Sequence, residues 1–500
     1  MKSSYTLFSL IFLTILTIAV RLPLMGRYAD SFDAVDFALG VENFDVFAMQ
    51  PHFPGYPVLM LFAHGINRIM HDPVQSLAFL NICSGSALIV PVYVIASRIW
   101  DRSIGWIAVG LVAVNPLLWI YSLQPMSDLP GVLGIVSSAA FVVLAWKTQK
   151  GERSQWIFAG LAIFLFGLAM GIRLSYFPFF IFLFHLIIIL PRSIKGYLYL
   201  IGTGCLSILL WFIPTALHEG GVVPYLQMGM AFTEGHFTEW GGTALDSQFS
   251  LMDRVRIIMG EHLILTGGIG WLDWEVNEWI TWLSILLWAL LCVWQYRNNR
   301  TAFTFFLLSS VPYALWVLLG QNADKPRHIL PLIPFLLMAF APLFGSKKWR
   351  KQTGPILLLI LLLFGTIGWE KGIEYRQTTS PMIQLVEYLD YHYQANNSVI
   401  FTWEEERVIH YYQPEWDAVR LKSFDYFTNK VLVYGIDPSK HLLLTDHVLQ
   451  GFGTQQEEIF PYLKKVAVFT GSPLFDPVYH EITLYEAKPS LLQYLKKAGS

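Results

Sequence analysis

An acidic segment lies directly after the first hydrophobic run of the chain. Asp30, Asp33 and Asp36 recur every third residue within YADSFDAVDFALG, residues 28–40. On a helix, side chains at this spacing share one broad face. Carboxylates held this close repel each other, and beside a membrane such a group is typical of a site for a cation, a proton or a reacting group. A solvated helix face gives the same pattern, so the interpretation depends on the rest of the chain.

A rigid turn follows the acidic segment. The run QPHFPGYPV, residues 50–58, has three prolines and one glycine, which favour a fixed turn over a helix. The turn contains His52 and Tyr56, and His52 is close enough in sequence to face the acidic helix. Such turns are common in loops. The combination of an acidic helix and a histidine-proline turn directly after the first span is more specific than either part.

Cationic side chains occur at two other places where hydrophobic runs begin. KPRHILPLIP, residues 325–334, brings Lys325, Arg327 and His328 together, and Arg173 occupies a comparable position. An arginine offers a two-pronged fork for a phosphate group, and a lysine offers a point charge. Ordinary anchoring at the membrane surface, with the charged ends reaching into water, is the alternative for these residues.

The composition is that of a polytopic membrane protein. Of 500 residues, 54% are hydrophobic and only 14% are charged, and the mean hydropathy is +0.48. The fold class we expect is mainly α, a transmembrane bundle of about eleven spans followed by a small α/β domain. The predicted spans are 6–25, 76–97, 104–122, 129–146, 155–172, 174–191, 197–217, 279–296, 302–319, 329–345 and 354–369.

Charge in the connections orients these spans. Alternate connections carry lysine and arginine with few acids, which predicts a cytoplasmic N-terminus and an extracytoplasmic C-terminus. Residues 1–369 would then form the membrane domain, with outer loops at 26–75 and 218–278. Residues 370–500 would form an extracytoplasmic α/β domain, because the short β-rich runs SVIFTW, AVRL, HLLLTD, KVAVFTG and EITLYEA alternate there with helical stretches.

Several other polar residues have structural explanations. We expect Asp128 to cap a helix, with contact to the active site as the alternative, and His185 to be a core histidine. The histidines and acids of the loop 218–278 could bind a metal, but no ligand spacing is diagnostic and a solvated loop explains them as well. We therefore assign no metal ligands and no certain cofactor, although the acidic segment could hold a divalent cation.

The order of these motifs resembles the first outer loop of the GT-C glycosyltransferases, the superfamily that includes protein O-mannosyltransferases and lipid A aminoarabinose transferases. Asp33-Ala-Val-Asp36-Phe37 and His52-Phe53-Pro54-Gly55-Tyr56-Pro57 stand at the family's acidic stretch and its His-Pro-Pro-Gly-Tyr-Pro turn. The chain departs from that pattern by Phe53 in place of a proline and by a longer gap. KPRHILPLIP and, more weakly, GIRLSYFPF at 171–179 are similar to later family motifs.

The resemblance implies transfer of a sugar from a polyprenyl-phosphate or polyprenyl-diphosphate carrier to a lipid, glycan or protein acceptor at the extracytoplasmic face. A carboxylate of the first loop would act as general base. We expect Asp33 in this role and Asp36 as the second candidate, with Asp30 as a supporting or acceptor-binding group. His52 and Tyr56 would bind substrate.

The lipid phosphate would be held by basic residues. We expect Lys325, Arg327, His328 and Arg173 to bind it. Membrane lipids are the other expected partners, and no nucleic acid is expected. A transporter or flippase is the rival interpretation, but its ionisable residues should line a pathway at mid-depth, whereas here they gather at span ends. A membrane anchor for the C-terminal domain would not need eleven spans.

Overall fold

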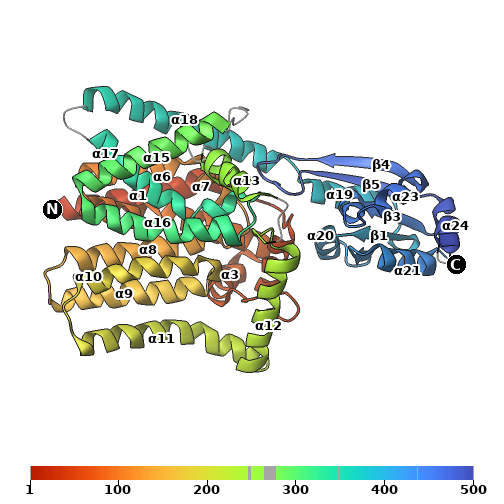
Figure 1. The fold of residues 1–500 in the computed structure, drawn as a ribbon, viewed down its shortest axis with the longest axis horizontal. Helices are drawn as coiled ribbons and strands as arrows, with labels where there is room; N and C mark the ends of the chain where they lie inside the picture. Colours follow the sequence, from red (N-terminus) through yellow and green to blue (C-terminus); the bar gives the residue numbers. More distant parts are fainter. Residues whose placement is uncertain are drawn as a thin grey trace. The chain divides into compact units, whose positions relative to one another are not determined.

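The computed structural model describes residues 2–245, 249–263, 278–345, 350–435, 437 and 439–498. These residues form two compact units (Figure 1). The first consists of Met1–Gly26 and Phe37–Arg376, and the second of Arg27–Asp36 and Gln377–Ser500. The acidic segment therefore belongs to the same compact unit as the C-terminal part of the chain.

The first unit is helical. Several of its helices begin at a side-chain cap or a proline, as where the Asp72 carboxylate accepts a hydrogen bond from the Gln75 amide. Its elements are α1 (Lys2–Arg21), η1 (Leu22–Leu24), most of α2 (Phe32–Glu42), α3 (Pro57–Met70), α4 (Pro73–Ala87), α5 (Ile89–Ile99), α6 (Arg102–Val114), α7 (Pro116–Tyr121), α8 (Asp128–Lys147), α9 (Arg153–Met170), η2 (Leu174–Phe184), α10 (His185–Ile189), α11 (Ile194–His218), α12 (Val222–Gly235), η3 (His236–Trp240), α13 (Leu251–Val255), η4 (Arg256–His262), α15 (Glu278–Asn298), α16 (Arg300–Gly320), η6 (Pro326–Ile329), α17 (Leu332–Gly345) and α18 (Arg350–Gln377).

Within the described residues, seven helices are long and apolar enough to cross a membrane. Four shorter apolar helical stretches, 102–114, 174–189, 285–294 and 332–345, lie at the other four predicted spans. The stretch that begins at Leu174 opens as a 3₁₀-helix with Pro178 inside it. The chain is a multi-pass membrane protein. Parts of the predicted loop 218–278, namely 246–248 and 264–277, lie outside the described residues.

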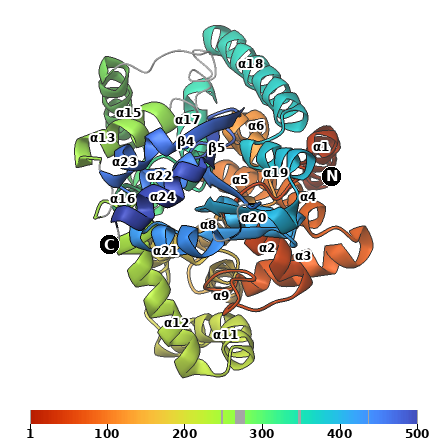
Figure 2. The ribbon, with the colours of Figure 1, turned by 90° about the vertical axis from the view of Figure 1, so that its right-hand side faces the viewer.

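Small residues bring neighbouring helices of the bundle close together. Gly134 of α8 lies against Ala169 of α9, and Gly167 of α9 lies against Ser207 of α11. A side chain at either glycine would meet the facing helix at less than 3 Å, so these positions permit the close approach that is typical of membrane helices. At its far end α11 leads into α12 (Figure 2).

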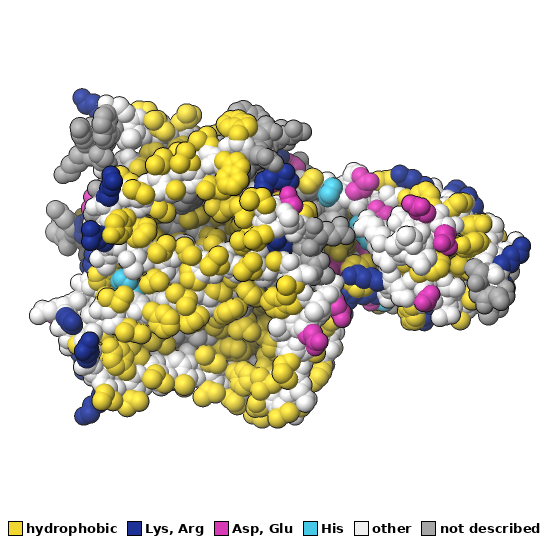
Figure 3. All heavy atoms as spheres, in the orientation of Figure 1, with side chains coloured by type: hydrophobic (Ala, Val, Ile, Leu, Met, Phe, Trp, Pro, Cys, Tyr) yellow, Lys and Arg dark blue, Asp and Glu magenta, His cyan; other side chains and the backbone are white. Residues whose placement is uncertain are grey.

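Hydrophobic side chains cover the flank of the bundle seen in Figure 3, and lysine and arginine side chains gather at its left-hand end. Exposed Leu198, Ile201 and Leu209 of α11 contribute to the apolar surface of the bundle. A flank of this kind has the composition expected for contact with lipid.

The second unit contains a five-stranded sheet in the order β2-β1-β3-β5-β4, in which β1 pairs in parallel with both β2 and β3, and β5 is antiparallel to β3 and β4. All five predicted β-rich runs form strands. Its elements are α19 (Pro381–His392), η7 (Ala395–Asn397), β1 (Ser398–Thr402), α20 (Glu405–Tyr412), β2 (Asp417–Arg420), α21 (Phe424–Tyr434), β3 (His441–Thr445), α22 (Asp446–Gln450), α23 (Gln455–Ile459), η8 (Phe460–Tyr462), β4 (Leu463–Thr470), β5 (Glu481–Ala487) and α24 (Pro489–Ala498).

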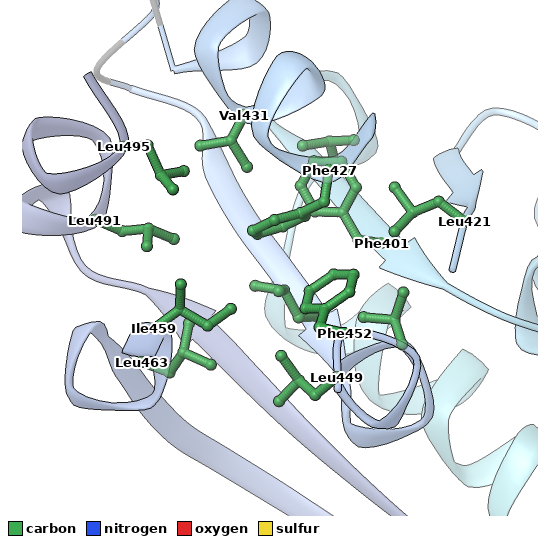
Figure 4. Packing of buried hydrophobic residues seen from close by; sticks show 13 residues of the cluster. Phe401, Leu421, Phe427, Val431, Leu449, Phe452, Ile459, Leu463, Leu491 and Leu495 are labelled. Atoms are coloured by element: carbon green, nitrogen blue, oxygen red, sulfur yellow. The ribbon is translucent and has the colours of Figure 1, made fainter. Parts of the chain in front are cut away.

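The second unit has a hydrophobic core of its own on one face of this sheet. Phe401 of β1 packs edge-to-face on Phe427 at 5.1 Å between ring centroids, and Phe427 packs on Phe452 at 5.0 Å (Figure 4). Leu491 and Leu495 of α24 close the same cluster. Every residue of β1 is buried, as expected for a central strand covered on both faces.

Candidate active site

The acidic segment spans the start of α2. Ser31 begins the helix, because its hydroxyl accepts a hydrogen bond from the Ala34 amide at 3.3 Å. Asp33 lies in the first turn, where a carboxylate is favoured by the helix dipole, and Asp36 lies one turn further along the same face. Asp30 precedes the helix. The predicted common face therefore holds for two aspartates of the three.

Asp36 is fully buried and forms an ion pair with Arg407 of α20. The Asp36 Oδ1 atom lies 2.8 Å from Arg407 Nε, and the Asp36 side chain is 0% exposed while that of Arg407 is 20% exposed. The Arg407 guanidinium also lies over the ring of Phe32, 5.7 Å from its centroid. Asp33, by contrast, is only half-buried. The structure thus gives the two carboxylates different surroundings.

Asp30 lies within electrostatic range of another acid, Asp476. Burial raises the pKa of Asp30, and burial together with the charge of Asp30 raises the pKa of Asp476. The neighbouring backbone is fixed by Tyr412, whose hydroxyl accepts a hydrogen bond from the Ala29 amide at 2.9 Å. Two half-buried carboxyl groups in this arrangement favour a state in which at least one of them holds a proton.

The predicted turn at 50–58 is ordered by aromatic packing. His52 Nε2 and the Tyr56 hydroxyl are 2.9 Å apart, and the imidazole stacks on Phe232 at 5.6 Å. Its ring also packs against Phe37 of α2. The Tyr225 hydroxyl donates to the Pro54 carbonyl at 2.9 Å, so α12 holds the turn through both Phe232 and Tyr225.

Arg173 is buried beside Asp128. Arg173 Nη2 lies 3.3 Å from Asp128 Oδ1, and the guanidinium also donates to the Ser127 hydroxyl and lies over the ring of Tyr176. The expectation that Asp128 caps a helix is wrong. Ser127 precedes α8 and Asp128 is its first residue, and the Asp128 carboxylate is paired with the Arg173 guanidinium, which offsets its buried charge.

Two tyrosines connect this ion pair to the basic motif at 325–328. Tyr176 packs edge-to-face on Tyr313 at 5.6 Å, and the Tyr313 hydroxyl donates to the His328 carbonyl at 3.0 Å. Arg327 Nη1 approaches the sulfur of Met126 at 3.9 Å, and Arg327 lies within electrostatic range of the Tyr176 hydroxyl. We call Arg173, Asp128, Tyr176, Tyr313 and Arg327 the tyrosine-arginine cluster.

The backbone that leads into Lys325 is held by donors from the preceding loop. Arg254 is 0% exposed, and its guanidinium donates to the carbonyls of Leu318 at 2.7 Å, Gly242 at 2.9 Å and Gln321. His262 Nε2 contacts the Ala323 carbonyl at 2.5 Å. The bonds to Leu318, Gln321 and Ala323 satisfy carbonyls at and beyond the C-terminal end of α16, which would otherwise lack partners.

The chain is similar to known proteins in both sequence and fold. The family model described as dolichyl-phosphate-mannose-protein mannosyltransferase matches residues 51–218, the stretch that holds His52, Asp128 and Arg173. The fold is similar to that of ArnT from Cupriavidus metallidurans bound to undecaprenyl phosphate, with a TM-score of 0.59 at 10% identity over 98% of this chain and 99% of that one. The chain therefore has a GT-C fold.

Two structures of an archaeal oligosaccharyltransferase are also similar. The oligosaccharyltransferase AglB from Archaeoglobus fulgidus, in complex with an inhibitory peptide and a dolichol-phosphate, aligns with a TM-score of 0.52 at 12% identity, over 96% of this chain and 76% of that one. The Archaeoglobus fulgidus oligosaccharyltransferase in complex with Zn and sulfate aligns with a TM-score of 0.53 at 14% identity, over 92% and 72%. No curated protein sequence matches the chain.

The fold brings together residues that are far apart in the sequence and whose contacts were not predicted from it. Three contacts between distant segments were not predicted, because no local spacing in the sequence marks them. They join Arg173 to Asp128, Asp36 to Arg407, and the C-terminal end of α16 to Arg254. Among the described residues, no group of three or more histidine, cysteine or acidic side chains is arranged as a metal site.

Proposed function

We propose that this GT-C protein transfers a sugar from a polyprenyl-phosphate or polyprenyl-diphosphate carrier to an acceptor at the extracytoplasmic membrane face. The observation that carries the proposal is the tyrosine-arginine cluster within a GT-C fold. It is a buried, hydrogen-bonded cation site built from separate helices, and it lies in a protein whose structural relatives bind undecaprenyl phosphate and dolichol-phosphate. The basic connections support a cytoplasmic N-terminus and an extracytoplasmic second unit.

The charges of the cluster suit one lipid phosphate. The carboxylate of Asp128 offsets the single positive charge of Arg173 and holds the guanidinium in place before a ligand binds. Arg327 and Lys325 then supply the charge that an incoming phosphate requires, and His328 lies in the same short helix η6. The C1–O bond to this phosphate breaks in the reaction, so cations here stabilise the leaving group.

Asp33 is the general base in this proposal. It takes the proton of the acceptor hydroxyl while that oxygen forms a bond to C1 of the sugar, and the polyprenyl phosphate leaves with the electron pair of the broken C1–O bond. Asp33 is a better candidate than Asp36, because Asp36 is wholly buried and its oxygen accepts from Arg407. Asp30, which precedes α2, is a supporting or acceptor-binding group in this proposal. His52, oriented by Tyr56 and Phe232, would position substrate.

The test is sugar transfer by the purified protein in nanodiscs, with radiolabelled polyprenyl-phosphate sugars as donors and with and without chelator to detect a divalent metal requirement. Asp33→Asn should lower turnover by about 10²- to 10⁴-fold. Glu42→Gln is the matched control, because Glu42 is an exposed acid at the far end of the same helix. Full activity of Asp33→Asn would remove it as the base. Movement of labelled lipid across the bilayer without donor consumption would favour a flippase.

A further inference from the structure

The carboxyl ends of β1, β2 and β3 meet at one edge of the second unit's sheet. The chain passes from β1 to β2 on one side and then to β3 on the other, so the strand order reverses at β1. Ligands of open α/β sheets bind outside the carboxyl ends of the strands at such a reversal. Here β1 is followed by Trp403, Glu404 and Glu405. We call this region the strand-edge site.

A buried ion pair joins the ends of β1 and β3 at this site. Glu405 is 0% exposed, and its Oε1 atom lies 2.6 Å from Nδ1 of His447, whose side chain is 10% exposed. The second oxygen of Glu405 accepts from the Trp403 amide at 2.9 Å. Burial opposes the charge on His447, but the hydrogen bond and charge of Glu405 outweigh it and raise the pKa of the imidazole. A protonated ring offers a second donor, Nε2, for a ligand.

An arginine stands at the end of β2, next to the same loop. The Arg420 guanidinium lies 4.3 Å from the centroid of the Trp403 ring and 4.8 Å from that of Phe32. Lys422 lies 3.9 Å from the same tryptophan ring. Arg420 and Lys422 are exposed. An arginine that stacks on an aromatic ring keeps its N–H donors in the plane of the guanidinium, where they can bind a carboxylate or phosphate with two parallel hydrogen bonds.

The acids of the strand-edge site already have donors from their own unit. Glu405 accepts from His447, Asp446 accepts from the Thr483 amide at 3.0 Å, and Glu404 is hydrogen-bonded to Tyr479. The side chains that can still donate hydrogen bonds to a ligand are therefore the cationic ones, Arg420 after β2 and His447 after β3. The ends of these two strands are separated by β1, a distance of about 10 Å.

Phe32 links the strand-edge site to the predicted base. This residue directly precedes Asp33, and its ring contacts Arg420 and Arg407. We propose that the strand-edge site binds the acceptor, and that this acceptor carries a carboxylate or phosphate group that Arg420 and His447 recognise. The inference rests on the proposed function, because it assigns the acceptor of the same reaction.

Binding can be measured without catalysis. Full-length protein in nanodiscs of phosphatidylcholine would be titrated with galacturonate, glucose 6-phosphate and uncharged glucose, and binding would be followed by ligand-observed NMR. We expect one of the two anionic sugars to bind at least tenfold more tightly than glucose, and the stronger of them identifies the anionic group. Arg420→Ala should weaken that binding about tenfold or more, and Arg420→Lys should restore it in part.

A matched control removes the same kind of charge elsewhere in the unit. Lys465→Ala changes an exposed cation on β4, at the other end of the strand order, and should leave binding unchanged. Equal loss in Arg420→Ala and Lys465→Ala, or no preference for anionic sugars in the wild type, would overturn the inference. If Arg420→Ala weakens sugar binding only when phosphatidylglycerol is added to the nanodiscs, the arginine binds lipid headgroups instead of the acceptor, and the inference is wrong.

The two proposals fail in different ways. A wild-type protein that binds anionic sugars but never consumes a polyprenyl-phosphate sugar contradicts the proposed function. A protein that releases sugar from the donor to water, yet shows the same affinity for charged and uncharged sugars in wild type and Arg420→Ala, retains the proposed function and contradicts the anionic acceptor.

Discussion

Asp36 Oδ1 accepts from Arg407 Nε at 2.8 Å, and this contact joins the acidic segment to helix α20. Both residues belong to one compact unit, although the sequence places them at opposite ends of the chain. A buried carboxylate tied to a cation is positioned to hold the start of α2, which also carries Asp33.

We predict that Asp36→Asn destabilises the protein by about 1–3 kcal/mol, less than for a fully buried pair because Arg407 is partly exposed. Thermal unfolding in nanodiscs measures the change. Arg407→Gln should have a similar effect, and the double variant should cost less than the sum of the two. A stable Asp36→Asn protein with lost transfer would instead make Asp36 the base.

A second prediction concerns Asp128. Asp128→Asn removes the counter-charge of a buried arginine, so the variant should be less stable than wild type without ligand. Undecaprenyl phosphate should then raise its unfolding temperature more than it raises that of wild type, since the phosphate replaces the lost charge. Equal shifts in the two proteins would show that the phosphate does not reach Arg173.

Arg254→Ala should affect the donor site from a distance. The substitution leaves three backbone carbonyls without their donor and should cost at least about 3 kcal/mol. If the variant folds, we expect the donor KM to rise about tenfold with a smaller change in kcat, because the backbone before Lys325 is less fixed. Arg256→Ala, an exposed arginine on the next helical segment, is the control. An unchanged donor KM in folded Arg254→Ala would contradict this role.

The Asp30–Asp476 pair predicts a dependence of stability on pH. Burial and the charge of Asp30 raise the pKa of Asp476 to about 8, whereas an unfolded aspartate titrates near pH 4. The folded state binds the proton more tightly, so this group lowers stability progressively as pH rises from about 4 to about 8. Asp476→Asn should therefore raise the unfolding temperature at pH 7 and leave it nearly unchanged at pH 4. A stabilisation that is the same at both pH values would exclude this cause.

Local pattern was sufficient for much of the fold. Hydropathy located an apolar helix at each of the eleven predicted spans, and the β-rich runs located all five strands, because both signals depend on residues adjacent in sequence. The sequence did not predict the partners of buried charges. Asp128 resembles a helix cap until Arg173 is brought beside it, and nothing near Arg407 in sequence indicates that it binds an aspartate of the first loop.

The helix boundary also limited the prediction for the acidic segment. A spacing of three residues suggested one face for all three aspartates, but Ser31 starts the helix and leaves Asp30 outside it. Because a capping hydroxyl and an aspartate can both begin a helix, the sequence alone did not decide between them. The roles of Asp33, His52 and Arg327 in catalysis and binding remain predictions, which the proposed variants test.

The assignment of Arg27–Asp36 to the C-terminal unit also has a consequence for biogenesis. Asp36 and Arg407 are 371 residues apart, so at about 5–20 residues per second the ribosome needs roughly 20 to 75 seconds to produce the partner of an aspartate already made. During that interval the spans can insert, but the segment that carries the predicted base cannot adopt its final packing. A nascent chain that stops before α20 therefore has an inserted bundle without an assembled acidic segment. With Asp33 as the general base, as we propose, sugar transfer can begin only after α20 has been synthesised.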